Sequence, residues 1–269
     1  MRKSLSFLVL FFALAASAAE ITRFGVAQES ALPLEGIKVL VWNTYQGGDN
    51  NFTYDYRGLA DTKHLALLQE ANLTQDMRKS LGEVPMGYTH AQSFRSAIGR
   101  VRMGVATGSV AKDVQATGLV SPVREVRSTT RKAALIQHFA LEGRMDSLMV
   151  TNVHAINFVP NGDFVRHIEQ IAAAMLSHEG PMLVGGDFNT WNVQRLHHLD
   201  RIFGRLGLTR VIFPPGRTRF PNIGVIFGVQ TGGELDQVYT RGLNVTSRSV
   251  NTDVTSSDHQ PLELQLSVL

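Results

Sequence analysis

The segment MLVGGDFNTWN (182–192) brings a carboxylate and a carboxamide directly to the end of an apolar run. Asp187 and Asn189 are two positions apart, so in an extended chain both side chains leave the backbone on the same side. A carboxylate that takes a proton from water, next to an amide that orients the water, is suited to hydrolysis. The two glycines before Asp187 are expected to break the strand and leave room at its end. The same residues also suit an ordinary turn, so both interpretations stay open for this segment alone.

Residues of the same kinds lie at the ends of other apolar runs. They are Asn43 (run 37–43), Gln69 and Glu70 (64–70), Asn152 and His154 (147–154), and Asp258 and His259 (directly before 261–269). In layered α/β folds, ligand-binding and catalytic residues gather at one edge of the sheets. Each residue alone is compatible with an ordinary strand end, but their repetition predicts one shared site.

Short apolar runs that alternate with helical patterns must hold these residues in place. The runs predict strands at 37–43, 64–70, 134–141, 147–154, 181–187, 235–242 and 261–269. Apolar residues at helical spacing predict helices at 163–179 and 193–208, the first capped by Asp163 and stopped by Gly180-Pro181. The histidines of the first helix, His167 and His178, are expected at its surface. Strands interleaved with helices predict a layered α/β or α+β fold.

The first 19 residues have the pattern of a secretory signal peptide. Arg2 and Lys3 precede the apolar run LSFLVLFFALAA, which the small residues SAA follow. We therefore expect a leader at 1–19, one domain at 20–269, and a periplasmic or secreted protein with no stable membrane association once the leader is removed. An uncleaved membrane anchor is the alternative.

Composition limits the kinds of site that the chain can build. The chain has 26 Lys and Arg against 23 Asp and Glu, a formal net charge of +3. Without Arg2 and Lys3 the balance is 24 against 23, so bulk charge gives little support for binding a polyanion. The chain has no cysteine, so any metal must use oxygen and imidazole ligands. We expect a monomer.

Six motifs along the chain carry a family resemblance. VWNTY, LLQEA, TNVHAINF, GGDFNTW, LDQVYTRG and SDHQPL occur in this order between residues 37 and 266. The series resembles that of the endonuclease/exonuclease/phosphatase superfamily, the DNase I-like proteins, and is most similar to its YafD-like bacterial branch. The resemblance implies a four-layer α/β sandwich of two packed mixed β-sheets flanked by helices, with the site at the loop end.

Hydrolysis of a phosphate ester needs neutralisation of charge on the phosphoryl oxygens, an aligned water and assistance to the leaving oxygen. Glu70, with Asn43 and Asp258, offers an oxygen-rich site suited to Mg²⁺ or Mn²⁺. The family resemblance implies that these positions hold the metal.

The resemblance also implies roles for the other polar residues. Asp187 and Asn189 would hold the attacking water or share a second metal site. His259 would be fixed by Asp236 through a carboxylate–imidazole hydrogen bond, and either His259 or Asp187 is the base. His154 would donate a proton to the leaving oxygen or bind a phosphate oxygen.

The substrate is less well defined by the sequence. Tyr45, Asn152, Trp191 and Arg219 are candidate substrate contacts, although Asn152 also suits a supporting role and Trp191 also suits packing under a loop. DNA or RNA is the expected substrate. Arginine clusters are most often solvated surface, but those that line the site would bind flanking phosphates of a nucleic acid, and aromatic residues beside them would strengthen this binding. The alternatives are a lipid or phosphoinositide phosphodiesterase or phosphatase, and a non-catalytic binding scaffold. The Pro- and Gly-rich segment 213–236 is expected to be a functional loop, without the apolar insertion that a membrane-docking loop needs.

Overall fold

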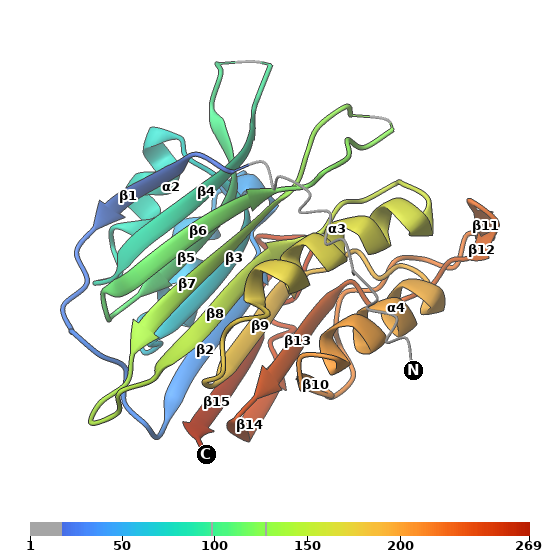
Figure 1. Cartoon of the computed structure of the whole chain (residues 1–269). Helices are drawn as coiled ribbons and strands as arrows, with labels where there is room; N and C mark the ends of the chain where they lie inside the picture. Colours follow the sequence, from blue (N-terminus) through green and yellow to red (C-terminus); the bar gives the residue numbers. More distant parts are fainter. Residues whose placement is uncertain (1–17, 98, 127) are drawn as a thin grey trace, which may run out of the picture.

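The computed structural model describes residues 18–97, 99–126 and 128–269, and in them two β-sheets pack face to face (Figure 1). The first sheet has the strand order β1-β4-β5-β3-β2-β15-β14, and the second has the order β10-β13-β9-β8-β7-β6. Apart from Ala18 and Ala19, the predicted leader lies outside the described residues. Within the described ranges, no helix is long and apolar enough to cross a membrane.

The bounds of the strands are as follows. The first sheet contains β1 (Ile21–Gly25), β2 (Ile37–Asn43), β3 (Leu65–Asn72), β4 (Gly87–Arg95), β5 (Arg102–Ser109), β14 (Leu243–Val250) and β15 (Leu262–Val268). The second sheet contains β6 (Asp113–Val120), β7 (Ala133–Ala140), β8 (Ser147–His154), β9 (Met182–Asp187), β10 (Thr209–Arg210) and β13 (Asp236–Arg241). A separate hairpin is formed by β11 (Val225–Ile226) and β12 (Val229–Gln230).

Helices cover the outer faces of both sheets. They are α1 (Phe52–Ala60), α2 (Gln75–Leu81), α3 (Asn161–Met175) and α4 (Val193–Gly204), and a short 3-10 turn spans Tyr45–Gly47. Figure 1 shows α3 and α4 side by side over the second sheet, with α2 behind the first. The four-layer sandwich implied by the family resemblance is therefore confirmed.

Alternation along the strands builds these layers. In β2, Val39 and Val41 belong to the apolar core between the sheets, whereas Leu40 and Trp42 pack with residues of α1 and α2. This is the period of two that a strand covered on both faces requires. On the far side, residues of α3 and α4 pack over β8 and β9 in a third apolar cluster.

Two parallel strand pairs bring the polar residues to one edge. β2 is parallel to β3, with Asn43 opposite Gln69, and β8 is parallel to β9, with His154 opposite Asp187. β13 runs antiparallel to β9 and places Asp236 opposite Asp187. We call the resulting group the polar rim; it consists of Asn43, Glu70, His154, Asp187, Asp236 and His259.

The two glycines before Asp187 do not break the strand as expected. β9 continues through both of them to Asp187. Gly186 has φ +146°, and a Cβ there would lie 1.9 Å from the carbonyl oxygen of Val153. A Cβ on Gly185 would come within 3.2 Å of a methyl group of Val41 in the other sheet. The glycines therefore permit close approach of a neighbouring strand and of the facing sheet, not extra room at the rim.

The bounds of α3 also differ from the prediction, whereas α4 begins at Val193 as predicted and ends at Gly204 instead of 208. α3 begins at Asn161, so Asp163 lies in its first turn instead of capping it, and the helix ends at Met175, before Gly180-Pro181. His167 is fully buried, contrary to the expected surface position, because it lies on the same face of α3 as the buried Phe164 and Ile171. Its Nδ1 accepts a hydrogen bond from the backbone N–H of Ile156 over 3.2 Å.

Candidate active site

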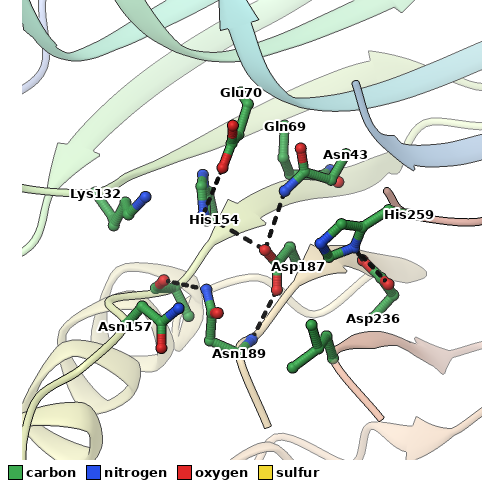
Figure 2. Close-up of polar contacts among 12 residues, drawn as sticks. Asn43, Gln69, Glu70, Lys132, His154, Asn157, Asp187, Asn189, Asp236 and His259 are labelled. Atoms are coloured by element: carbon green, nitrogen blue, oxygen red, sulfur yellow. Dashed lines mark hydrogen bonds and ion pairs between the residues drawn. The ribbon is translucent and has the colours of Figure 1, made fainter. Parts of the chain in front are cut away.

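Asp187 lies at the centre of the polar rim and is only 3% exposed. Its Oδ1 accepts a hydrogen bond of 2.9 Å from the backbone N–H of Asn189. Its Oδ2 accepts one of 3.1 Å from Asn43 Nδ2 and lies 3.5 Å from His154 Nε2 (Figure 2). The carboxylate is thus held from three sides and presented in one orientation.

Glu70 reaches the rim because β3 is irregular at this point. The pairing of β3 with β5 shifts register between Leu68 and Ala71, and Glu70 has φ +53°. Such a backbone is unfavourable for a non-glycine residue and is typical of functional sites. The side chain stays 25% exposed, with its Oε1 3.9 Å from His154 Nε2. The bulge therefore directs this carboxylate toward the rim.

His259 and Asp236 form the predicted carboxylate–imidazole pair. His259 Nδ1 lies 2.9 Å and 3.1 Å from the two carboxylate oxygens of Asp236. Trp42 Nε1 donates to the carbonyl oxygen of His259 over 2.8 Å, and Ser257 Oγ donates to that of Asn43 over 2.7 Å. These bonds fasten the loop before β15 to the end of β2 and fix the imidazole ring at the rim.

Burial and neighbouring charges change the protonation of these groups. Burial raises the pKa of Asp187 to about 7, with Asp236 adding to the rise and His259 opposing it. Burial alone would lower the pKa of His259, but the adjacent Asp236 carboxylate outweighs it and raises the pKa to about 10. Burial lowers the pKa of His154 well below its usual value, and the charge of Lys132 acts in the same direction. Near neutral pH the rim therefore holds a carboxylate ready to accept a proton, a cationic His259 and a neutral His154.

Asn189 is held in an unusual backbone conformation. It has φ +51°, a left-handed value that asparagine tolerates better than most residues. Its Nδ2 donates to the carbonyl oxygen of Ala155 over 3.0 Å, which joins the loop after β9 to the loop after β8. Asn189 therefore contacts Asp187 through its backbone N–H, and the two side chains do not leave one extended strand as expected.

Lys132, a member of one of the basic clusters in the sequence, is a rim neighbour that no motif indicated. It immediately precedes β7, and its Nζ lies 3.7 Å from Glu125 Oε1. Figure 2 shows its side chain extending toward Glu70 and His154. The same Glu125 oxygen accepts the backbone N–H of Asn157 over 2.9 Å. A lysine directly before an apolar run was the available signal, but only the antiparallel pairing of β7 with β8 places it at this edge.

Two predicted substrate contacts are wrong. Asn152 is fully buried between the sheets, where its Oδ1 accepts from Gln69 Nε2 over 2.7 Å and its Nδ2 donates to the carbonyl oxygen of Ala106 over 2.9 Å. Trp191 is also fully buried, in a small apolar cluster with Val229 and Leu235. Asn152 therefore has the supporting role, and Trp191 the packing role, that the sequence analysis gave as their alternatives.

Tyr45 and Asp258 lie together beside the rim. They line a cavity of about 330 Å³ with Asp49 and the residues 255–257. Asp258 is exposed, and its charge contributes to the raised pKa of His259. Arg219 lies in a different place, on the exposed part of the 213–236 loop, where it pairs with Glu234 and lines a second cavity of about 330 Å³.

The 213–236 loop contains an exposed apolar hairpin, contrary to the expectation that it has no apolar insertion. Ile223, Val225 and Phe227 are 64%, 66% and 50% exposed. On the opposite face of β11 and β12, Ile226 and Val229 pack onto Trp191. Figure 1 shows this hairpin at the edge of the molecule, beyond α4.

The chemistry of the oxygen donors at the rim and beside it fits a hard divalent cation. Glu70 supplies one partly exposed carboxylate, Asn43 an amide oxygen, and Asp258 an exposed carboxylate. Mg²⁺ commonly uses one or two carboxylates and keeps several waters. Within residues 18–97, 99–126 and 128–269, no three His, Cys, Asp or Glu side chains lie close enough together to form a metal cage.

Comparisons with known proteins agree with the motifs. The sequence profile described as the Endonuclease/Exonuclease/phosphatase family matches residues 40–259. A UPF0294 protein of Vibrio vulnificus (strain CMCP6) is 32% identical over 245 residues, which are 90% of this chain and 78% of that protein.

Solved structures share the fold at low sequence identity. A protein of this family from Leptotrichia buccalis has a TM-score of 0.65 at 16% identity, covering 86% of this chain and 99% of that one. A mannosyl-6-phosphatase of Bacteroides thetaiotaomicron has a TM-score of 0.61 at 14% identity, covering 86% and 99%. With the profile match over most of its length, the chain belongs to the endonuclease/exonuclease/phosphatase family.

Proposed function

We propose that the polar rim hydrolyses a phosphodiester by in-line attack of water, assisted by Mg²⁺ or Mn²⁺. The single observation that carries this proposal is the arrangement around Asp187, which Asn43, Asn189 and His154 surround while the His259–Asp236 pair lies alongside. A base, an orienting amide and a cation at one edge are the parts that phosphoryl transfer requires.

Of the two candidate bases, Asp187 and His259, the proposal assigns the role to Asp187. A general base works best when its pKa lies near the working pH, and burial raises the pKa of Asp187 to about 7. His259 is unsuited to the role because Asp236 keeps it protonated; as an imidazolium it stabilises negative charge on the phosphoryl oxygens. Neutral His154 donates a hydrogen bond to the leaving oxygen, and Asn189 orients the water.

Glu70, Asn43 and Asp258 would hold the metal. When bound, a divalent ion supplies the positive charge that neutralises the phosphoryl oxygens. Asn43 also donates to Asp187, so the same side chain links the metal ligands to the base.

We propose nucleic acid as the substrate. Lys132 adds a cation to the rim, and exposed arginines lie on the loops that flank it, with Arg100 between β4 and β5 and Arg124 between β6 and β7. Figure 1 shows these two loops projecting on the same side of the molecule. Cations beside a site of phosphodiester cleavage suit a substrate with a phosphate at every residue.

A phospholipid-type phosphodiester is the second candidate, and the apolar hairpin favours it. Three exposed apolar side chains on one hairpin suit contact with a lipid surface. The hairpin stem packs on Trp191, two residues after Asn189, so a docked hairpin would lie close to the rim.

We propose that the protein acts in the periplasm or outside the cell, which the signal-peptide pattern supports, and that it acts as a monomer. The test is incubation of the purified protein with DNA, RNA, sphingomyelin vesicles and inositol phosphates, each with Mg²⁺, Mn²⁺ or EDTA. Cleavage of DNA or RNA that EDTA abolishes is expected. Cleavage confined to the vesicles would select the second candidate, and no metal-dependent cleavage by folded protein would refute the proposal.

A further inference from the structure

Arg195 is a fully buried arginine on α4 that the reaction scheme does not use. Its guanidinium lies between two aromatic rings, 4.7 Å from the centroid of Phe164 and 4.5 Å from that of Trp191. It donates hydrogen bonds to the carbonyl oxygens of Ile156 (3.2 Å), Asn189 (3.0 Å) and Val159 (2.7 Å) and to Asn161 Oδ1 (3.4 Å).

Burial of this cation is costly. Every hydrogen-bond acceptor that it reaches among the described residues is a neutral oxygen. Burial lowers the pKa of Arg195 to about 9, while the more distant charges of Glu125 and Asp187 oppose this. A cation without a carboxylate partner gives poor net stability for its desolvation. The hydrogen bonds of Arg195 are therefore better explained by a role in holding the two loops together than by a gain in stability.

The acceptors lie on two loops that both reach the rim. Ile156 and Val159 belong to the loop after β8, on either side of Phe158, which has φ +36°. Asn189 belongs to the loop after β9 and has φ +51°. Loop carbonyls next to left-handed residues have no strand or helix partner, and the planar guanidinium satisfies several of them at once.

A short chain of hydrogen bonds connects Arg195 to the centre of the rim. Arg195 donates to the carbonyl oxygen of Asn189, whose own N–H donates to Asp187 Oδ1. Asn189 Nδ2 in turn holds the carbonyl oxygen of Ala155 at the start of the other loop. Movement of the guanidinium would therefore displace both loops and the amide that fixes Asp187.

We propose that Arg195 is a positioning residue that fixes Asn189 and the two loops relative to Asp187. Its effect on turnover rests on the proposed function, whereas its effect on the loops does not.

The chain offers a matched control in Arg241. This half-buried arginine also ties loops together through carbonyl oxygens, those of Leu206 (2.9 Å), His178 (2.6 Å) and Gly180 (2.7 Å). It lies at the opposite end of β13 from Asp236. Loss of Arg241 should therefore weaken the fold without reaching the rim.

The first measurement is amide hydrogen exchange in full-length protein, which needs no substrate. In Arg195→Met, the amide of Asn189 and those of residues 155–159 should exchange at least about tenfold faster, while the amides within β9 keep their protection. Arg241→Met should leave these loops unchanged. Unchanged exchange at Asn189 in Arg195→Met would overturn the proposal, whatever the enzyme's substrate.

The second measurement is steady-state hydrolysis of whichever substrate is cleaved. Arg195→Met should lower kcat about 100-fold with little change in KM, because misplacement of the catalytic groups acts on the transition state. Arg195→Lys, which keeps the charge and some of the bonds, should recover part of kcat. It also serves as the test variant if Arg195→Met does not fold. Equal loss of kcat in the Arg195 and Arg241 variants would overturn a positioning role. Altered loop exchange in a protein without activity would refute the proposed function alone.

Discussion

Asn43 Nδ2 donates a hydrogen bond of 3.1 Å to Asp187 Oδ2, and this bond joins the end of β2 in one sheet to the end of β9 in the other. The rim is therefore built across the sandwich. Deeper between the sheets, Gln69 Nε2 of β3 donates a hydrogen bond to Asn152 Oδ1 of β8 and so joins the two sheets in the same way. The relative placement of the two sheets thus fixes the geometry of the site.

Replacement of Asp187 by Asn should change stability in a pH-dependent way. The folded-state pKa of Asp187 is raised to about 7, so its ionisation costs stability progressively as pH rises from the unfolded value near 4. Relative to wild type, Asp187→Asn should gain stability between pH 4 and pH 8, by up to about 4 kcal/mol. Urea denaturation in EDTA at both pH values measures this difference. A difference that is the same at pH 4 and pH 8 would show that the carboxylate is not desolvated.

The contribution of His259 to the free energy of unfolding should also fall as pH rises, but over a higher pH range than that of Asp187. Its folded-state pKa of about 10 lies above the unfolded value, so its contribution is fully present below about pH 6.5 and is lost as pH rises toward 10. His259→Asn keeps a donor for Asp236 but cannot titrate. The loss of unfolding free energy between pH 7 and pH 9 should therefore be smaller in this variant than in wild type. Parallel pH profiles would contradict a protonated His259.

His167 should make the protein sensitive to acid. Burial lowers the pKa of His167 to about 3, so the stability that depends on its neutral form is complete above about pH 6.5 and falls as pH decreases. Between pH 6.5 and pH 5 the loss is about 2 kcal/mol. His167→Asn, which can still accept from Ile156, should remove this part of the loss. Replacement of the exposed His197 by Asn is the control and should leave the profile unchanged.

Lys132 should contribute to the binding of anionic substrate. Lys132→Met should raise KM about tenfold at low salt and reduce the dependence of log KM on log salt by about one unit. Lys112→Met removes an equal charge away from the rim, because Lys112 immediately precedes β6 and lies beside the far end of β7. It should change neither quantity. If both variants alter KM equally, bulk charge and not the position of Lys132 is responsible.

The central strands and the rim could be predicted because they rest on local patterns. A strand buried on both faces has an uninterrupted apolar run, and the polar residue at its end is visible in the sequence, as at Asn43 and Asp187. The order of the six motifs then indicated the family to which the chain belongs. β4, β5, β6 and β14 were missed because their small and polar residues, as in GYTHAQSFR, DVQATGLV and LNVTSRSV, resemble those of loops.

The supporting residues could not be assigned because their roles depend on tertiary contacts. Trp191 and Asn152 lie close in sequence to the rim residues, but the first is covered by the 213–236 loop and the second by the facing sheet. Lys132 reaches the rim only through antiparallel pairing, and Arg195 acts through carbonyl groups that no residue type reveals.

The most direct test of the account is hydrolysis of an oligonucleotide by wild type, Asp187→Asn and the surface control Asp146→Asn, with Mg²⁺ and with EDTA. Wild type and Asp146→Asn should cleave at equal rates with Mg²⁺ and not with EDTA. Asp187→Asn should lose about 10³-fold or more in kcat with its fold intact, as expected for loss of a general base. Metal-dependent cleavage by Asp187→Asn at the wild-type rate would contradict the assignment of Asp187 as the base at the centre of the polar rim.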